Sequence, residues 1–235
     1  MTRTELLNRA AHCYLSADLL DDACRCFEKL EDYARAARLH ERRERWEPAA
    51  RCYERARTWA DAARCYLQCA LPEEAARCLL KTDNSLDAAW ILAEQAHRFE
   101  RAHDISQAIT PTGLAEALAV KLITARCQAG WQHPEQAAMI LGDVLRHLAE
   151  LEANLERQRL ETWALTVAEV LQRPDLSATF HAAAVVAGTP GAVRRWEVWA
   201  LQHLGDATGV PLENALPETA WEAGEIDAKG FSSDK

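Results

Sequence analysis

Cysteine is the residue type with the most evident chemical potential in this sequence. The chain has eight cysteines, and four of them fall in one stretch: Cys52, Cys65, Cys69 and Cys78. Grouped thiolates of this kind are typical ligands of zinc and of iron–sulfur clusters. Two Glu-x-x-His runs, Glu94–His97 and Glu100–His103, offer a second candidate metal site, because di-iron carboxylate proteins use that motif from two facing helices.

Arginine recurs with a spacing of thirteen residues, at Arg25, Arg38, Arg51, Arg64 and Arg77. A row of guanidinium groups can clamp an acidic partner or phosphates. Most of these arginines also have an acidic residue three positions away, as Arg64 has Asp61, and such pairs are ordinary solvated helix partners that contribute about 0.2–0.5 kcal/mol each. Both interpretations remain open. The segment from Arg35 to Arg57 has eight arginines against four glutamates, so we expect a partner to bind in this region, with the following contact residues: Arg38, Arg42, Arg51, Arg55 and Arg64.

The sequence lacks the motifs of common enzymes. It has no Gly-x-Ser-x-Gly, no glycine-rich phosphate loop before Lys-Ser or Lys-Thr, and no His-Glu-x-x-His. Each of these motifs holds a nucleophile, a phosphate or a metal in a fixed local geometry. We therefore predict a protein that is not an enzyme, with no catalytic residue and no cofactor.

The elements that carry these residues repeat every thirteen residues. An alanine opens each of seven successive blocks: Ala10, Ala23, Ala36, Ala49, Ala62, Ala75 and Ala88. Apolar or small residues occupy positions one, two, four, five and eight of a block, for example Ala62, Ala63, Cys65, Tyr66 and Cys69. This spacing marks one face of an α-helix. Each block therefore predicts a helix of about eleven residues and a turn of about two.

Helices this short are marginal alone in water, so they must pack on their neighbours. Short connections make neighbouring helices antiparallel, and hairpins of two blocks then stack into a solenoid with one continuous core. Asp32, Thr58 and Asn84 stand where N-caps are expected, and an aspartate follows Thr58 and Asn84 three residues later, as in a capping box. The sequence predicts an all-α fold, an α-solenoid of short antiparallel helical hairpins with thirteen residues per helix, followed by longer helices.

The repeat also distinguishes between the hypotheses for cysteine. Five cysteines occupy the fourth position of their blocks: Cys13, Cys26, Cys52, Cys65 and Cys78. Equivalent positions in stacked helices lie about 8–10 Å apart or more, whereas zinc ligands lie within about 2.3 Å of one ion. We therefore predict that the cysteines fill the core and bind no metal. The two Glu-x-x-His runs are predicted to lie on one helix, six residues apart, and so to point in different directions.

The run Trp59–Tyr66, with copies at Tyr33–His40 and Trp46–Tyr53, resembles the aromatic-x-x-Ala-x-x-x-Tyr core of tetratricopeptide-like repeats. It is especially similar to the shortened helical hairpins of coatomer and intraflagellar-transport solenoids. A tetratricopeptide unit has about 34 residues, so each helix here is about one turn shorter. The glycine usual in the turn is replaced, at Ala17, Leu30, Arg43, Ala56 and Cys69. The resemblance covers about the first hundred residues and implies a binding scaffold.

The pattern changes after the seventh block, which we expect to continue without a turn to about Asp104. The run Ile105–Gly113 breaks the helical pattern, and we predict two domains, residues 1–104 with the short repeat and residues 112–206 with longer helices. These helices form a bundle or continue the solenoid, and are predicted at Leu114–Ala129, Pro134–Glu152, Leu155–Gln172, Pro174–Ala187 and Pro190–Leu204. Residues 207–235 are expected to be an acidic, disordered tail. In it, Trp221 either docks on a partner or folds back onto the solenoid.

A formal net charge of −9 argues against nucleic acid as the main partner. No stretch approaches the roughly 20 apolar residues of a membrane span, and we expect no signal peptide. Eight cysteines without an export signal predict a reducing cytoplasm, and the many alanines and arginines are compatible with a bacterial source.

The function predicted from the sequence is a scaffold or adaptor that binds a protein or peptide partner, from the same operon or complex, on a helical-repeat surface. Two alternatives remain open. One is a regulatory subunit of a bacterial defence or signalling system that docks an enzyme. The other is a nucleic-acid or phosphate binder that uses the row of arginines.

Overall fold

The computed structural model describes residues 2–205, and its contacts divide the chain into two compact units, Met1–Ile109 and Thr110–Lys235. Within the described residues all regular structure is helical, which confirms the predicted all-α class. The first unit contains α1 (Arg3–Ser16), α2 (Leu20–Lys29), α3 (Tyr33–Arg42), α4 (Trp46–Arg55), α5 (Trp59–Gln68), α6 (Pro72–Leu79) with the short 3₁₀ helix η1 (Leu80–Thr82), α7 (Ser85–Glu94) and α8 (Phe99–Ala108).

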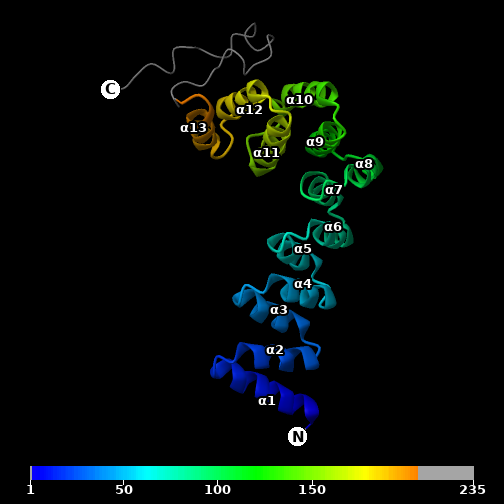
Figure 1. Cartoon of the computed structure of the whole chain (residues 1–235), viewed down its shortest axis with the longest axis vertical. Helices are drawn as coiled ribbons and strands as arrows, with labels where there is room; N and C mark the ends of the chain where they lie inside the picture. Colours follow the sequence, from blue (N-terminus) through cyan, green and yellow to red (C-terminus); the bar gives the residue numbers. More distant parts are fainter. Residues whose placement is uncertain (1, 206–235) are drawn as a thin grey trace, which may run out of the picture. The chain divides into compact units, whose positions relative to one another are not determined.

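The helices of the first unit form the predicted solenoid, since each one packs against the next from α1 to α8 (Figure 1). From the second block onward the alanine at position one is fully buried in every repeat: Ala23, Ala36, Ala49, Ala62, Ala75 and Ala88. A methyl group at the contact lets neighbouring helix axes approach closely. Partly buried aromatic residues pack over this core: Tyr33, Trp46 and Trp59.

The same turn follows each of the helices α1 to α5. At the end of α4, the N–H of Arg57 donates to the carbonyl of Glu54 (3.0 Å) and the N–H of Thr58 donates to the carbonyl of Tyr53 (3.0 Å). This is a Schellman motif, whose penultimate residue must adopt the left-handed conformation. A left-handed residue that is not glycine lies in every connection between helices of the first unit, and its φ is between 52° and 59°: Asp18, Glu31, Glu44, Arg57, Ala70, Asp83 and His97.

The residues that replace the usual turn glycine in the sequence comparison lie one position before the left-handed residue. Ala56, for example, is the C-cap of α4 with φ −74°, and the left-handed residue is Arg57. The predicted N-caps are confirmed at Asp32, which accepts from the N–H of Arg35, and at Asn84. Thr58 is the N-cap residue of α5 as predicted, but its hydroxyl donates to a backbone carbonyl of the preceding helix and makes no capping hydrogen bond.

The seventh block does not continue as one helix to Asp104, as predicted from the sequence. α7 ends at Glu94, and α8 begins at Phe99. Between them His97 is left-handed with φ 52°, and the N–H of Arg98 donates to the carbonyl of Leu92 (2.8 Å). The first unit therefore gains one more helix in the same repeating arrangement.

The second unit contains the longer helices α9 (Leu114–Gly130), α10 (Pro134–Leu148), α11 (Leu155–Val170), α12 (Pro174–Val186) and α13 (Ala192–His203). α9 packs on both α10 and α11, α11 on α12, and α12 on α13. The Schellman turn recurs here, with left-handed Gln132, Gln172 and Gly188. Gly130, predicted to follow a helix end, lies inside α9, and α13 begins after Pro190 because Gly191 is also left-handed.

A buried carboxylate connects the elements of the second unit. The side chain of Glu161 on α11 is 1% exposed, and it accepts hydrogen bonds from Arg157 (2.9 Å), Thr189 (2.8 Å) and Arg195 (3.1 Å). A buried charge is stable only when it is paired and hydrogen-bonded, so this network holds α11 and α13 in place. No described helix has the length and apolar character to span a membrane.

Candidate functional site

Three glutamates in the first unit each contact side chains from the two helices that follow. Glu28, Glu41 and Glu54 occupy the sixth position of their blocks, near the ends of α2, α3 and α4. We call each glutamate together with its side-chain partners on those two helices a carboxylate cluster. The members are Glu28, His40 and Cys52 in the first cluster, Glu41, Tyr53, Arg64 and Cys65 in the second, and Glu54, Tyr66, Arg77 and Cys78 in the third.

The Glu54 cluster shows the complete arrangement. The hydroxyl of Tyr66 on α5 donates to one carboxylate oxygen of Glu54 (2.8 Å). The guanidinium of Arg77 (2.7 Å) and the thiol of Cys78 (3.4 Å), both on α6, donate to the other oxygen. The carboxylate thus receives hydrogen bonds from two successive helices, which fixes their packing.

The Glu41 cluster repeats this geometry thirteen residues earlier. Tyr53 on α4 donates its hydroxyl to Glu41, and α5 provides the guanidinium of Arg64 (2.6 Å) and the thiol of Cys65 (3.6 Å). In both clusters a cation lies against the carboxylate, so the charge of the glutamate is balanced locally.

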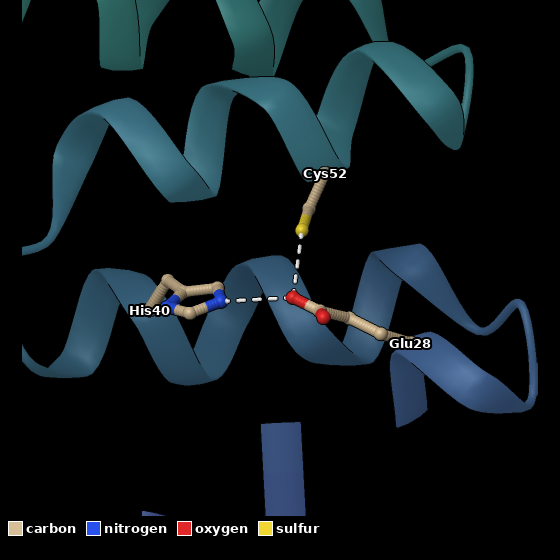
Figure 2. A group of neighbouring side chains, drawn as sticks. All are labelled: Glu28, His40 and Cys52. Carbon is tan, nitrogen blue, oxygen red and sulfur yellow. Dashed lines mark hydrogen bonds and ion pairs between the residues drawn. The ribbon is translucent and has the colours of Figure 1, made fainter. Parts of the chain in front are cut away.

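The Glu28 cluster differs from the other two. A histidine replaces the tyrosine, with Nε2 of His40 3.4 Å from Oε1 of Glu28, and the thiol of Cys52 lies 3.8 Å from the same oxygen. Figure 2 shows both side chains pointing at this atom. Arg51, which corresponds to Arg64 and Arg77, instead pairs with Glu47 on its own helix. The donor atoms of Glu28, His40 and Cys52 all lie within 4.8 Å of one another, so these residues could hold a metal ion.

The clusters follow a spacing of twelve residues, one less than the period of the repeat. Glu28 meets His40 twelve residues later and Cys52 twenty-four residues later, and the other clusters keep the same spacing. Sequence reasoning compared equivalent positions, thirteen residues apart, and concluded that their side chains do not converge. The signal that finds the clusters is a glutamate followed by His or Tyr and then Cys at intervals of twelve.

Burial and hydrogen bonding set the protonation of these groups. Burial alone raises the pKa of a carboxyl group, but hydrogen bonds from Tyr53 and Arg64 hold the pKa of Glu41 below its ordinary value. Burial, and next the charge of the nearby glutamate, raise the pKa of the Cys65 and Cys78 thiols to about 12. These cysteines are therefore protonated at neutral pH and are poor nucleophiles.

An open groove of about 720 Å³ runs over α4, α5 and α6. Apolar surface in it comes from Trp59, Tyr66 and Leu71. Charged surface comes from three arginines and three glutamates: Arg51, Arg55, Arg77, Glu47, Glu54 and Glu74. The groove therefore offers apolar contact together with charges of both signs, as protein-binding surfaces commonly do.

The arginines of the groove differ in their partners. Arg51 pairs with Glu47, and Arg77 pairs with Glu54 and Glu74. The guanidinium of Arg55 lies over the ring of Tyr33, with 5.4 Å between Cζ and the ring centroid, and it makes no ion pair within the described residues. Arg55 is thus the groove cation best placed to receive an acidic group.

The structure separates the predicted contact residues into different sites. Arg51 and Arg55 line the groove, Arg64 belongs to the Glu41 cluster, and Arg38 and Arg42 are exposed on α3. Trp221 lies outside the described residues. Of the five arginines at position three, all but Arg38 make an ion pair within residues 2–205.

The predictions for the other candidate metal ligands have mixed outcomes. All eight cysteines are free thiols, and six are buried, which confirms the predicted core position for most of them. The prediction was wrong for Cys13, which is exposed near the end of the first helix, and Cys69 is only partly buried. The role of the buried cysteines is more specific than filling space, because Cys52, Cys65 and Cys78 contact carboxylates. The Glu-x-x-His runs do not lie on one helix, since α7 carries Glu94 and α8 carries Glu100, and neither run forms a group of metal ligands among the described residues.

No protein family, curated protein or solved structure shows significant similarity to this chain.

Proposed function

We propose that this protein is a non-catalytic scaffold of the tetratricopeptide-like class, which binds a protein or peptide partner on its first unit. The observation that carries the proposal is the groove over α4, α5 and α6. Its wall is made of helices that the carboxylate clusters connect to one another, so the surface is preformed. A preformed surface binds without the cost of ordering itself.

The side chains of the groove favour a particular kind of partner. Trp59 and Leu71 provide apolar contact, and Arg55 provides a cation that no carboxylate within residues 2–205 neutralises. We expect a segment that places an apolar side chain against Trp59 and an acidic side chain near Arg55. Tryptophan and arginine are the residue types that contribute most often to binding energy at protein interfaces.

The ion pairs along the arginine row favour this function over phosphate binding. An arginine that already contacts a carboxylate must lose that partner before it can bind a phosphate. Among the position-three arginines, Arg38 alone has no ion pair within the described residues. A nucleic-acid surface needs an excess of free positive charge, and the net charge of the chain is −9.

The experiment has two stages. The tagged full-length chain is first used to isolate partners, which are identified by mass spectrometry and confirmed by direct binding of the purified partner. The double substitution Arg51→Glu and Arg55→Glu is then expected to weaken binding of that partner at least tenfold. The matched control is Arg25→Glu, which reverses the equivalent exposed charge on α2, outside the groove. Equal affinity of both variants, or binding that weakens steeply with salt and is competed by nucleic acid, would refute the proposal.

A second candidate function, docking of an enzyme by the second unit, is favoured by the surface of α13. Four large apolar side chains on this helix and its C-cap are exposed: Val193, Val198, Leu201 and Leu204. At 100° per residue they fall within a stripe about 140° wide, which is typical of a helix face that packs on something. Val198→Glu is expected to abolish capture of a partner that binds there and to leave binding at the groove unchanged. If the same partner is lost with Arg51→Glu and Arg55→Glu but retained with Val198→Glu, this second function is wrong.

A further inference from the structure

We propose that Glu28, His40 and Cys52 form a zinc-binding site that connects α2, α3 and α4. The three residues come from three successive helices and provide one oxygen, one nitrogen and one sulfur ligand (Figure 2). Carboxylate, imidazole and thiolate are the three ligand types that Zn²⁺ accepts in proteins. The proposal is independent of the groove and of the proposed partner.

Two of the three distances between the ligand atoms are close to those of a tetrahedral site, and the third, between His40 and Cys52, is at most 4.8 Å. With Zn–N and Zn–O bonds of about 2.0 Å and a Zn–S bond of about 2.3 Å, the N–O edge of a tetrahedron is about 3.3 Å and the S–O edge about 3.5 Å. The Nε2 atom of His40 is 3.4 Å from Oε1 of Glu28, and Sγ of Cys52 is 3.8 Å from the same oxygen. A metal ion thus requires side-chain shifts of a few tenths of an ångström along these two edges.

The comparison with the other clusters gives an independent reason for a cation here. In the Glu41 and Glu54 clusters a guanidinium group balances the carboxylate. In the Glu28 cluster Arg51 turns away to Glu47, and no arginine contacts Glu28 within the described residues. Zn²⁺ with the carboxylate and a thiolate has no net charge, so the ion supplies the positive charge that the other two clusters receive from arginine.

The exposure of the ligands indicates an open fourth position. The side chain of His40 is 12% exposed and that of Glu28 is 40% exposed, whereas Cys52 is buried. The ion would therefore have three protein ligands and a water molecule on the side of Glu28. The Nδ1 atom of His40 is buried and has no hydrogen-bond partner, and Nε2 is the ring nitrogen that faces Glu28.

Binding is expected to release the proton of Cys52. Burial, followed by the charge of Glu28, raises the pKa of this thiol to about 11, with Cys24 on α2 adding to the rise and Arg55 on its own helix opposing it. The thiol is thus protonated at neutral pH, and zinc must displace one proton from it. Isothermal titration calorimetry at pH 7 in two buffers with different ionisation enthalpies measures this release. We expect about one proton per zinc ion, and an affinity that falls about tenfold for each unit by which the pH is lowered.

The test uses the full-length chain, reduced and stripped of metal, titrated with Co²⁺ and then with Zn²⁺. Cobalt reports the ligands directly, because tetrahedral coordination gives intense visible absorption and a cysteine ligand adds a thiolate charge-transfer band. We expect one equivalent of Co²⁺ to give both signals and Zn²⁺ to remove them. Cys52→Ala should abolish the charge-transfer band, and His40→Tyr should weaken binding at least 100-fold.

Two variants make the result specific to this cluster. His40→Tyr is expected to fold, because tyrosine occupies the equivalent position in the next two clusters. Cys65→Ala is the matched control, since Cys65 donates to a glutamate in the same way but has no histidine beside it. Its cobalt spectrum should equal that of the unmodified chain. Absence of the charge-transfer band, undiminished binding by His40→Tyr, or an equal loss in Cys65→Ala would each overturn the proposal.

Discussion

Glycine in the repeated turn is expected to stabilise the protein at one position and to destabilise it at the position before. Arg57 is left-handed with φ 59°, and its exposed side chain makes no ion pair within the described residues. Ala56, directly before it, is the C-cap of α4 with φ −74°. The two residues are adjacent in sequence but differ in the backbone conformation that they require.

The magnitudes follow from the two conformations. A residue with a Cβ atom loses roughly 1–2 kcal/mol in the left-handed region, and glycine does not. A substitution to glycine also lowers the free energy of unfolding by about 0.5–1 kcal/mol, because glycine makes the unfolded chain more flexible. Arg57→Gly should therefore raise the free energy of unfolding by about 0.5–1 kcal/mol. Ala56→Gly relieves no left-handed strain and only makes the unfolded chain more flexible. It should therefore lower the free energy of unfolding by about 1 kcal/mol.

The assay is urea unfolding of the two variants and the unmodified chain, followed by far-ultraviolet circular dichroism. The two glycine variants should differ by about 1.5–2 kcal/mol. Because the turns are separate, the gains should add when glycine replaces the left-handed residue in five turns, reaching about 2.5–5 kcal/mol: Asp18, Glu31, Glu44, Arg57 and Ala70. If Ala56→Gly is the more stable of the single variants, Arg57 is not the residue at which a Cβ atom is strained, and this account of the turn is wrong.

Three further predictions concern charge and burial. Glu161→Ala should lower the free energy of unfolding by about 3–5 kcal/mol in urea unfolding, since it leaves Arg157 buried without its carboxylate; a loss below 1 kcal/mol would contradict the role of this network. Burial, followed by the charges of Arg195 and His203, lowers the pKa of His181 to about 4. The unfolded chain then binds the extra proton first, so stability should be complete above pH 6.5 and fall by up to about 3 kcal/mol toward pH 4, and His181→Phe should remove most of that dependence in acid titrations of unfolding. In a timed reaction of the native chain with a thiol reagent, exposed Cys13 should react before Cys65 and Cys78, whose pKa is about 12; equal rates would contradict their burial.

The thirteen-residue period predicted the fold of the first unit, because the same pattern determines how the helices pack on one another and how long each helix is. Alanine at position one allows close helix contacts, and the thirteen-residue block leaves room for one short helix and one turn. The boundary after Glu94 was missed for a local reason. His97 follows Asp83 by fourteen residues, so the turn lies one residue outside the strict register. Left-handed turns formed without glycine leave little trace in the sequence, because residues as different as Arg57, Ala70 and Asp83 occupy them.

The carboxylate clusters were missed because side chains of successive helices meet at a spacing of twelve residues, one less than the period of the repeat. A periodic sequence draws attention to equivalent positions, and Cys52, Cys65 and Cys78 are equivalent. Each of these thiols instead meets a glutamate two helices earlier. The replacement of tyrosine by His40 is visible in the sequence, but its significance depends on knowing that Glu28 and Cys52 lie beside it.

The clusters and the groove share residues, and this connects the stability of the solenoid to binding. Glu54, Tyr66 and Arg77 form the third cluster and also line the groove. A partner that draws Arg77 away from Glu54 would leave a partly buried carboxylate without its cation, at a cost in stability. Binding that uses Arg55 has no such cost, because that guanidinium lies over the ring of Tyr33 and makes no ion pair within the described residues. The acidic group of a partner should therefore settle at the Arg55 end of the groove, while the Glu54 cluster remains intact beneath it.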